Sequence, residues 1–189
     1  MTFPPIILAS KSPRRQELLK LMDLDFRIVL KEVDESYPEG LQPEEVAVYI
    51  ATKKAHAFDG AADGHIVLTA DTIVCIDNKI LGKPASPENA VEMLQMLAGR
   101  MHRVITGVCL MYNGKVDQFF EVSEVYFRDM AETEIRSYVD QYSPMDKAGA
   151  YGIQEWIGVT GIIKINGSYT NVVGLPTEKV YQHLTKIIK

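Results

Sequence analysis

Apolar residues along the chain follow two patterns that alternate. Short apolar runs indicate strands, and longer segments whose apolar residues recur every three or four positions indicate helices. The predicted strands are residues 6–9, 26–30, 65–77, 102–112, 115–127 and 161–165. The predicted helices are residues 13–22, 43–58, 87–97 and 132–142, followed by a closing helix after Pro176. This alternation predicts an α/β or α+β fold with a mixed sheet.

Turn residues mark where several of these elements begin or end. Ser12-Pro13 and Ser86-Pro87 are helix-start signals. The Ser hydroxyl can cap free backbone N–H groups, and Pro needs no hydrogen-bond partner in the first turn. Asn113-Gly114 lies between two β-rich runs and is the strongest hairpin signal in the chain.

Length, charge and cysteine usage restrict the class of protein. A chain of 189 residues suits one domain with a sizeable core, so residues 1–189 are predicted to form a single domain. The net charge of −5 argues against a broad surface for nucleic acid or anionic membranes, so any anion site must be local. No apolar run is long enough to span a membrane. Cys75 and Cys109 lie in apolar runs without a CxxC partner, which indicates reduced, buried thiols and a cytoplasmic protein.

Three cations crowd the start of the first predicted helix. Lys11, Arg14 and Arg15 surround a position where the helix dipole is already positive and acidic residues are favoured. A strand-to-helix turn presents backbone N–H groups that bind phosphate, and arginine can grip phosphate oxygens with two donors. The turn therefore indicates a phosphate site, with a solvated basic turn as the alternative. The chain has neither a P-loop nor a GxGxxG fingerprint, so further cations must be sought.

Two lysines are candidates for completing such a site. Lys54 shares an apolar stripe with Ile50 and Phe58 on the second predicted helix. Its side chain either extends to water, which is the commoner outcome, or points into a site. Lys83 lies in a Gly-Lys-Pro turn after a strand, where a lysine is usually solvated.

Acidic residues supply the other half of the chemistry. Asp71 lies inside the apolar run 65–77, where a carboxylate is costly unless it is hydrogen-bonded, paired with a cation or bound to metal. One interpretation is that Asp71 is hydrogen-bonded to nearby backbone and has a structural role. The other is that Asp71 is a general base, a metal ligand or both. Asp34 and Glu35 follow a strand and would alone be read as a solvated loop. Together, cations and buried carboxylates suit a nucleotide with Mg²⁺, which prefers oxygen ligands and phosphate.

Several motifs, in order along the chain, carry a family resemblance. They are LASKSPRRQELL, the Lys54 helix, ADTIV with LGKP downstream, HRVITGV, DKAGAYGIQ and INGSYTNVVGLP. Together they resemble the Maf family of nucleoside triphosphate pyrophosphatases, from residue 6 to about residue 180. The segments DKAGAYGIQ and GSYTNVVGLP resemble the subgroup that hydrolyses dTTP and UTP, whereas the sister subgroup acting on 7-methyl-GTP has a different ending.

The resemblance implies a fold and a role for particular residues. It implies a single domain with a central, elongated mixed sheet flanked by helices, like that of inosine triphosphatases. Asp71 matches the catalytic proton acceptor, and Glu35 matches an acidic active-site position, so both are candidate metal ligands. The positions that match nucleotide-binding or base-selecting residues are Ser10, Arg14, Arg15, Lys54, Thr72, Lys83 and Gln154. Glu155 and Trp156 depart from the family pattern, in which small residues such as Gly are common there.

The expected activity is hydrolysis of dTTP and UTP, and of modified pyrimidine nucleotides, to a nucleoside monophosphate and diphosphate. Water would attack the α-phosphorus with the help of a divalent cation, Mg²⁺ or Mn²⁺. The resemblance also implies a cytoplasmic enzyme that is often a homodimer and that removes unwanted nucleotides. The alternative is a non-catalytic nucleotide sensor or a nucleic-acid-binding regulator of cell division. The buried acid argues against the sensor, and the net charge argues against stable nucleic-acid or membrane binding.

Overall fold

The computed structural model describes residues 3–60, 62 and 64–187, which form two compact units. Unit 1 comprises Met1–Thr72, Thr106–Glu121 and Gly174–Lys189, and unit 2 comprises Ile73–Ile105 and Val122–Val173. Three long strands contribute residues to both units, namely β3 (Ile66–Ile76), β5 (Met101–Tyr112) and β6 (Lys115–Phe127). The expectation that residues 1–189 form one domain stays a prediction.

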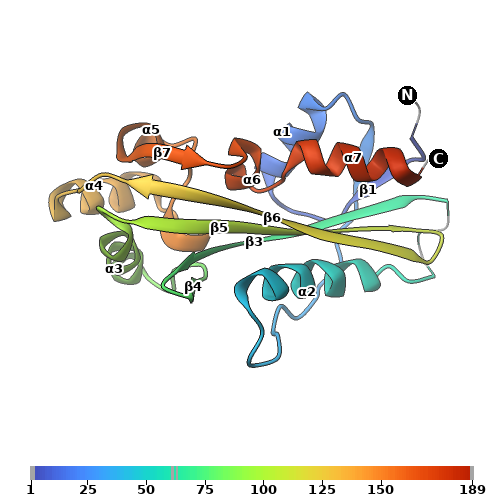
Figure 1. Ribbon diagram of the computed structural model, residues 1–189, viewed down its shortest axis with the longest axis horizontal. Coiled ribbons are helices and arrows are strands. Elements are labelled where there is room, and N and C mark those ends of the chain that lie inside the picture. Colours follow the sequence, from blue (N-terminus) through green and yellow to red (C-terminus); the bar gives the residue numbers. More distant parts are fainter. Residues whose placement is uncertain (1–2, 61, 63, 188–189) are drawn as a thin grey trace. The chain divides into compact units, whose positions relative to one another are not determined.

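Unit 1 is built from strands with helices on both faces (Figure 1). Its elements are β1 (Ile6–Leu8), α1 (Pro13–Leu21), β2 (Phe26–Ile28), α2 (Pro43–His56) and α7 (Thr177–Ile187), with parts of β3, β5 and β6. Strand β1 pairs in parallel with β2 and with β3, so that Ile6 lies opposite Phe26 and Ile66. Helix α2 covers one face, and α1 and α7 cover the other (Figure 1).

Small residues bring α2 close to the strands of unit 1. Ala51 and Ala55 of α2 are fully buried in a core cluster with Val67 of β3 and Cys109 of β5. Gly107 of β5 faces the helix backbone so closely that a Cβ built on it would lie 2.3 Å from the carbonyl carbon of Ala47. The missing side chain therefore sets the spacing between α2 and the sheet.

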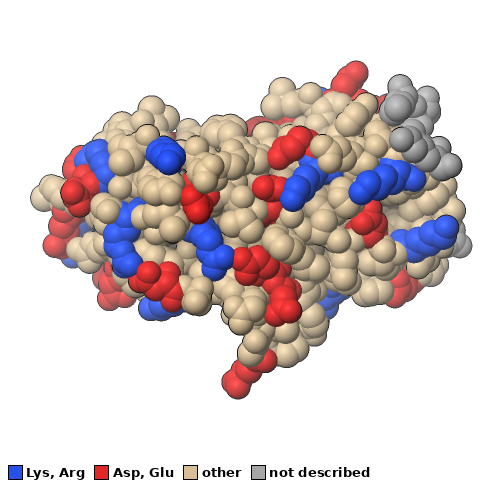
Figure 2. All heavy atoms as spheres, in the orientation of Figure 1, with Lys and Arg blue, Asp and Glu red and all other residues tan. Residues whose placement is uncertain are grey.

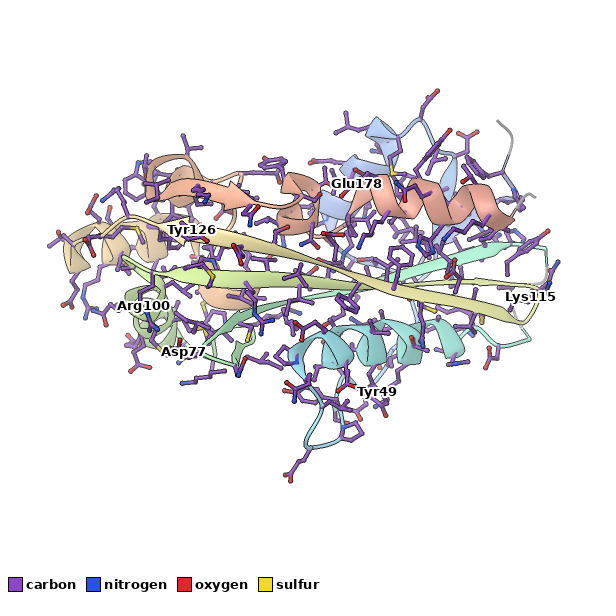
Figure 3. All side chains as sticks on the ribbon, viewed as in Figure 1. Tyr49, Asp77, Arg100, Lys115, Tyr126 and Glu178 are labelled. Carbon is purple, nitrogen blue, oxygen red and sulfur yellow. The ribbon has the colours of Figure 1, made fainter. Side chains whose placement is uncertain are left out.

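Unit 2 adds shorter elements around the other parts of β3, β5 and β6. They are β4 (Lys79–Leu81), α3 (Pro87–Leu97), α4 (Glu132–Tyr142), the 3-10 helix η1 (Ala148–Ala150), α5 (Trp156–Gly161), β7 (Ile162–Asn166) and α6 (Tyr169–Val173). Strand β4 pairs antiparallel with β3 across a turn at Asp77 and Asn78, and β7 pairs antiparallel with β6. Asp77 also forms an ion pair of 2.5 Å with Arg100 (Figure 3).

The fold class predicted from the pattern is confirmed. The strand order is β2-β1-β3-β5-β6-β7, with β4 on β3, and parallel and antiparallel pairs occur together. The predicted starts are also confirmed: the Ser12 hydroxyl accepts from the N–H of Arg15, and that of Ser86 accepts from the N–H of Asn89. The pattern missed β4, η1, α5 and α6, each at most six residues long.

The cysteines and the surface charges agree with their expected character. Cys75 and Cys109 are free and buried, and burial raises the pKa of the Cys109 thiol to about 11. On the face shown in Figure 2, Lys and Arg side chains are interspersed with Asp and Glu. Within the part of the chain that the structure describes, no helix is both long and apolar enough to cross a bilayer.

A buried histidine in unit 2 makes stability depend on pH. His102 is 1% exposed, contacts the ring of Phe127, and lies 2.8 Å from the Tyr151 hydroxyl through its Nε2. Burial lowers its pKa to about 3. An unfolded histidine titrates near ~6.5, so between about pH 6.5 and 3 the unfolded chain binds a proton that the folded chain does not. Stability should therefore fall as the pH falls through this range.

We expect the free energy of unfolding to decrease by about 2 kcal/mol between pH 7 and pH 5 on account of His102. Urea titrations at both pH values measure this difference. The variant His102→Gln should lack this part of the pH dependence, whatever its stability at pH 7. His56→Gln, a change at an exposed histidine, should retain it. If His102→Gln had the same pH dependence of stability as wild type, His102 would not be the group responsible for it.

Candidate active site

The first site residues lie where β1 passes into α1. Ser10 is 8% exposed, and its hydroxyl accepts hydrogen bonds from the backbone N–H of Ser12 and from the guanidinium of Arg15. Arg14 lies in the first turn of α1, which contains no acidic residue. The turn thus has the concentration of positive charge that the sequence predicts.

The Arg15 guanidinium is bonded to protein atoms on several segments of unit 1. Its Nε donates to the carbonyl of Gly174 at 2.8 Å, and its Nη1 donates to the carbonyl of Ala70 at 2.9 Å and to the Ser10 hydroxyl at 3.3 Å. Its Nη2 donates to the Thr72 hydroxyl at 2.9 Å. Burial lowers the pKa of Arg15, and the negative charge of Asp71 opposes this effect.

A lysine and two carboxylates form the second part of the site. The Lys54 ammonium lies 2.7 Å from Oδ1 of Asp71 and 2.8 Å from Oε1 of Glu35. The side chains of Lys54 and Asp71 are 17% and 15% exposed, whereas that of Glu35 is 51% exposed. Of the two orientations left open for Lys54, the structure therefore has the one directed into the site.

Asp71 owes its position to the alternation of side chains along β3. The Thr69 hydroxyl donates to the carbonyl of Ala51 on α2. Asp71, two residues later on the same face of β3, accepts a hydrogen bond from Lys54 of the same helix. Thr72 points to the opposite face, where it contacts Arg15 and lies 2.9 Å from the Thr106 hydroxyl. Residues one apart in a strand face opposite sides, and residues two apart face the same side.

Lys83 and Gln154 belong to unit 2 and are both exposed. Lys83 follows β4, and the preceding carbonyl of Gly82 accepts from the N–H of Gly149, which ties this turn to the loop that leads to Gln154. Next to Gln154, the Glu155 carboxylate accepts from the Tyr138 hydroxyl and lies 3.0 Å from the ammonium of Lys147.

Several functional contacts could not be read from residue types. The acceptors at Ala70 and Gly174 are backbone carbonyls, and Thr106 resembles any other strand threonine. Gly174 has a φ of +130°, a conformation that favours glycine. The glycine at this position is therefore the sequence feature that could have indicated an unusual backbone there. Of the two residues that depart from the family pattern, Trp156 begins α5 and is 37% exposed, whereas the side chain of Glu155 is only 24% exposed.

The oxygen atoms of Asp71 and Glu35 are suitable donors for a hard divalent cation. Both carboxylates converge on the same nitrogen, so the two side chains reach one location. Mg²⁺ is commonly held by one or two carboxylates together with substrate phosphates. Among the described residues, no group of three or more His, Cys, Asp or Glu side chains is arranged to hold a metal.

Solved structures define the class of fold. A HAM1 protein from Coxiella burnetii aligns with a TM-score of 0.51 over 97% of this chain and 99% of that chain, at 18% identity. The Ham1 protein of Staphylococcus aureus aligns with a TM-score of 0.54 over 98% of this chain and 100% of that chain, at 16% identity. At these identities the likeness concerns the fold alone.

The chain belongs to the family described as Maf-like protein, whose model matches residues 5–187. A dTTP/UTP pyrophosphatase of Flavobacterium psychrophilum is 51% identical over 95% of this chain and 92% of its own length. A protein of the same name from Bacteroides thetaiotaomicron is 50% identical over 96% of this chain and 95% of its own length. The family predicted from the sequence motifs is therefore confirmed.

Proposed function

We propose that this chain is a nucleoside triphosphate pyrophosphatase that hydrolyses dTTP and UTP to the nucleoside monophosphate and pyrophosphate. The observation that carries the proposal is the Lys54 ammonium between Asp71 and Glu35, close to a cationic strand-to-helix turn. It combines a positioned carboxylate with cations suited to a triphosphate. Relatives named dTTP/UTP pyrophosphatase that are about half identical over almost the whole chain support the choice of substrate.

The proposed reaction uses Asp71 as the base and the cations as electrostatic stabilisers. A water molecule attacks the α-phosphorus, a new P–O bond forms, and the bond to the oxygen bridging the α- and β-phosphorus breaks. The proton of the water passes to the Asp71 carboxylate, and pyrophosphate leaves. Arg14 and Lys54 offset the charge of the triphosphate and of the leaving group, and Ser10 contributes its hydroxyl. The predicted roles of Lys83 in phosphate binding and of Gln154 in base selection stay predictions.

We further propose that Asp71 and Glu35 would hold a divalent cation, Mg²⁺ or Mn²⁺. Each carboxylate has a second oxygen besides the one that contacts Lys54, and carboxylate oxygen is the donor type that such an ion prefers. When bound, the ion would neutralise charge on the phosphate oxygens. We also propose a cytoplasmic location and assembly as a homodimer.

The substitution Glu35→Gln should weaken binding of Mn²⁺ at least ~10-fold, because it removes an anionic donor and even residues that only support a metal ligand have effects on this scale. Electron paramagnetic resonance of free Mn²⁺, titrated with protein in the presence of a non-hydrolysable dTTP analogue, measures this without turnover. Glu39→Gln changes an exposed carboxylate in the same loop and should leave the affinity unchanged. Equal affinities of wild type and Glu35→Gln would remove Glu35 from the metal site.

A panel of nucleoside triphosphates assayed for pyrophosphate release in the presence of Mg²⁺ tests the function as a whole. We expect dTTP and UTP to be hydrolysed ahead of the purine nucleotides, 7-methyl-GTP included. Faster turnover of 7-methyl-GTP would refute the proposed substrate class. Absence of pyrophosphate release from every nucleotide would refute the enzymatic function and favour a nucleotide sensor.

A further inference from the structure

We propose that Arg15 is a positioning residue that fixes β3 on both sides of Asp71, in place of the phosphate contact expected from the sequence. The inference rests on the proposed function, because it assigns Arg15 a part in placing the proposed base. It separates the roles of two adjacent arginines that look equivalent in the sequence.

The acceptors of Arg15 flank Asp71 along the strand. Nη1 donates to the carbonyl of Ala70, the residue before Asp71, and Nη2 donates to the hydroxyl of Thr72, the residue after it. The carboxylate of Asp71 points the other way, to Lys54 on α2. Arg15 thus holds the strand from the face opposite to the reacting group.

The remaining contacts of Arg15 fix the guanidinium itself. Nε donates to the carbonyl of Gly174 and Nη1 donates to the Ser10 hydroxyl, so three separate segments of unit 1 meet at one planar group. Four of the five N–H donors of the guanidinium are directed to protein acceptors. A two-donor grip on phosphate would require at least one of these bonds to break, since it needs two donors.

The contact between Arg15 and Gly174 connects the motif INGSYTNVVGLP to Asp71, the proposed base. Gly174 ends the segment NGSYTNVVG, and a Cβ built on it would lie 3.7 Å from the Thr72 hydroxyl and 3.8 Å from Nε of Arg15. Its φ of +130° is costly for other residues, so its carbonyl direction depends on glycine. A change at Gly174 would therefore reach Asp71 through Arg15 and β3.

Matched substitutions at the two arginines test the proposal. Arg14→Gln and Arg15→Gln are compared for dTTP turnover and for binding of inorganic tripolyphosphate, a probe without a base. We expect Arg15→Gln to lower kcat at least ~10-fold, because small displacements of a reacting group are costly. Its Kd for tripolyphosphate should change less than twofold. Arg14→Gln should instead weaken tripolyphosphate binding about 10-fold, through loss of a charge-assisted contact. Equal weakening by both variants would overturn the proposal.

Two further measurements keep the result decisive if Arg15→Gln folds poorly. Thr72→Val removes one acceptor of Arg15 and should lower kcat with no change in tripolyphosphate affinity; an unchanged kcat would count against the proposal. Amide hydrogen exchange at residues 70–72 should be faster in Thr72→Val and in Arg15→Gln than in wild type. An inactive wild-type protein would refute the proposed function. Hydrogen exchange and tripolyphosphate binding do not depend on turnover, so these two measurements would still test whether Arg15 holds β3.

Discussion

Replacement of Asp71 by Asn is expected to lower turnover of dTTP at least ~10²-fold, the usual scale for a positioned general base. The amide keeps the shape of the side chain but loses the negative charge and the proton acceptor. Lys54, which lies 2.7 Å from Asp71 Oδ1, retains Glu35 as a partner, so the fold should survive. Binding of the triphosphate should persist, because the cations proposed to hold it are on other residues.

Pyrophosphate release, thermal melting and dTTP binding measured on Asp71→Asn distinguish an enzyme from a nucleotide sensor. Asp77→Asn is the matched control, because Asp77 is an exposed carboxylate paired with Arg100. This control should retain wild-type turnover. Full activity of Asp71→Asn would exclude Asp71 as the base, and loss of folding would show that its charge is structural.

Replacement of Gly107 by Ala is expected to destabilise the protein by roughly 3 kcal/mol, the upper end of the usual cost of overpacking a core. The added methyl group would lie 2.3 Å from the backbone carbonyl carbon and oxygen of Ala47. Backbone cannot turn aside as a side chain can, so α2 must move away from β5. Because Lys54 is on α2, its contact with Asp71 should lengthen, and activity should fall as well.

Guanidinium unfolding and dTTP turnover of Gly107→Ala measure the two effects. Gly82→Ala is the matched control for stability, since a Cβ there has nothing within 4 Å and the backbone of Gly82 lies outside the left-handed region. It should change the free energy of unfolding by less than about 1 kcal/mol. Unaltered stability of Gly107→Ala would show that α2 is held less closely than described.

The long elements of the fold could be predicted because their patterns repeat. Helix α2 and strands β3, β5 and β6 each span at least eleven residues, and Asn113-Gly114 marks the hairpin between β5 and β6. The missed strand β4 has three residues, too few to show a period of two. Its turn, Asp77-Asn78, has positive φ at both residues without a glycine, so the usual signal is absent.

The sequence predicted which residues belong to the candidate site, but it did not predict most of the hydrogen bonds and ion pairs between them. The cost of a carboxylate in an apolar strand pointed to Asp71, and the structure supplies the compensating cation, Lys54. The sequence treats Arg14 and Arg15 alike, since both carry the same charge beside the same helix start. Only the structure separates them, because the partners of Arg15 include backbone carbonyls far away along the chain.

The ammonium of Lys54 gives this cluster an internal counterion. Two neighbouring carboxylates would repel each other, and many proteins must load a metal before such a pair can fold. Here the ammonium of Lys54 contacts both Asp71 and Glu35, so one of their two negative charges is offset by the chain itself. The chain itself thus supplies part of the charge compensation that this pair of carboxylates needs in order to fold.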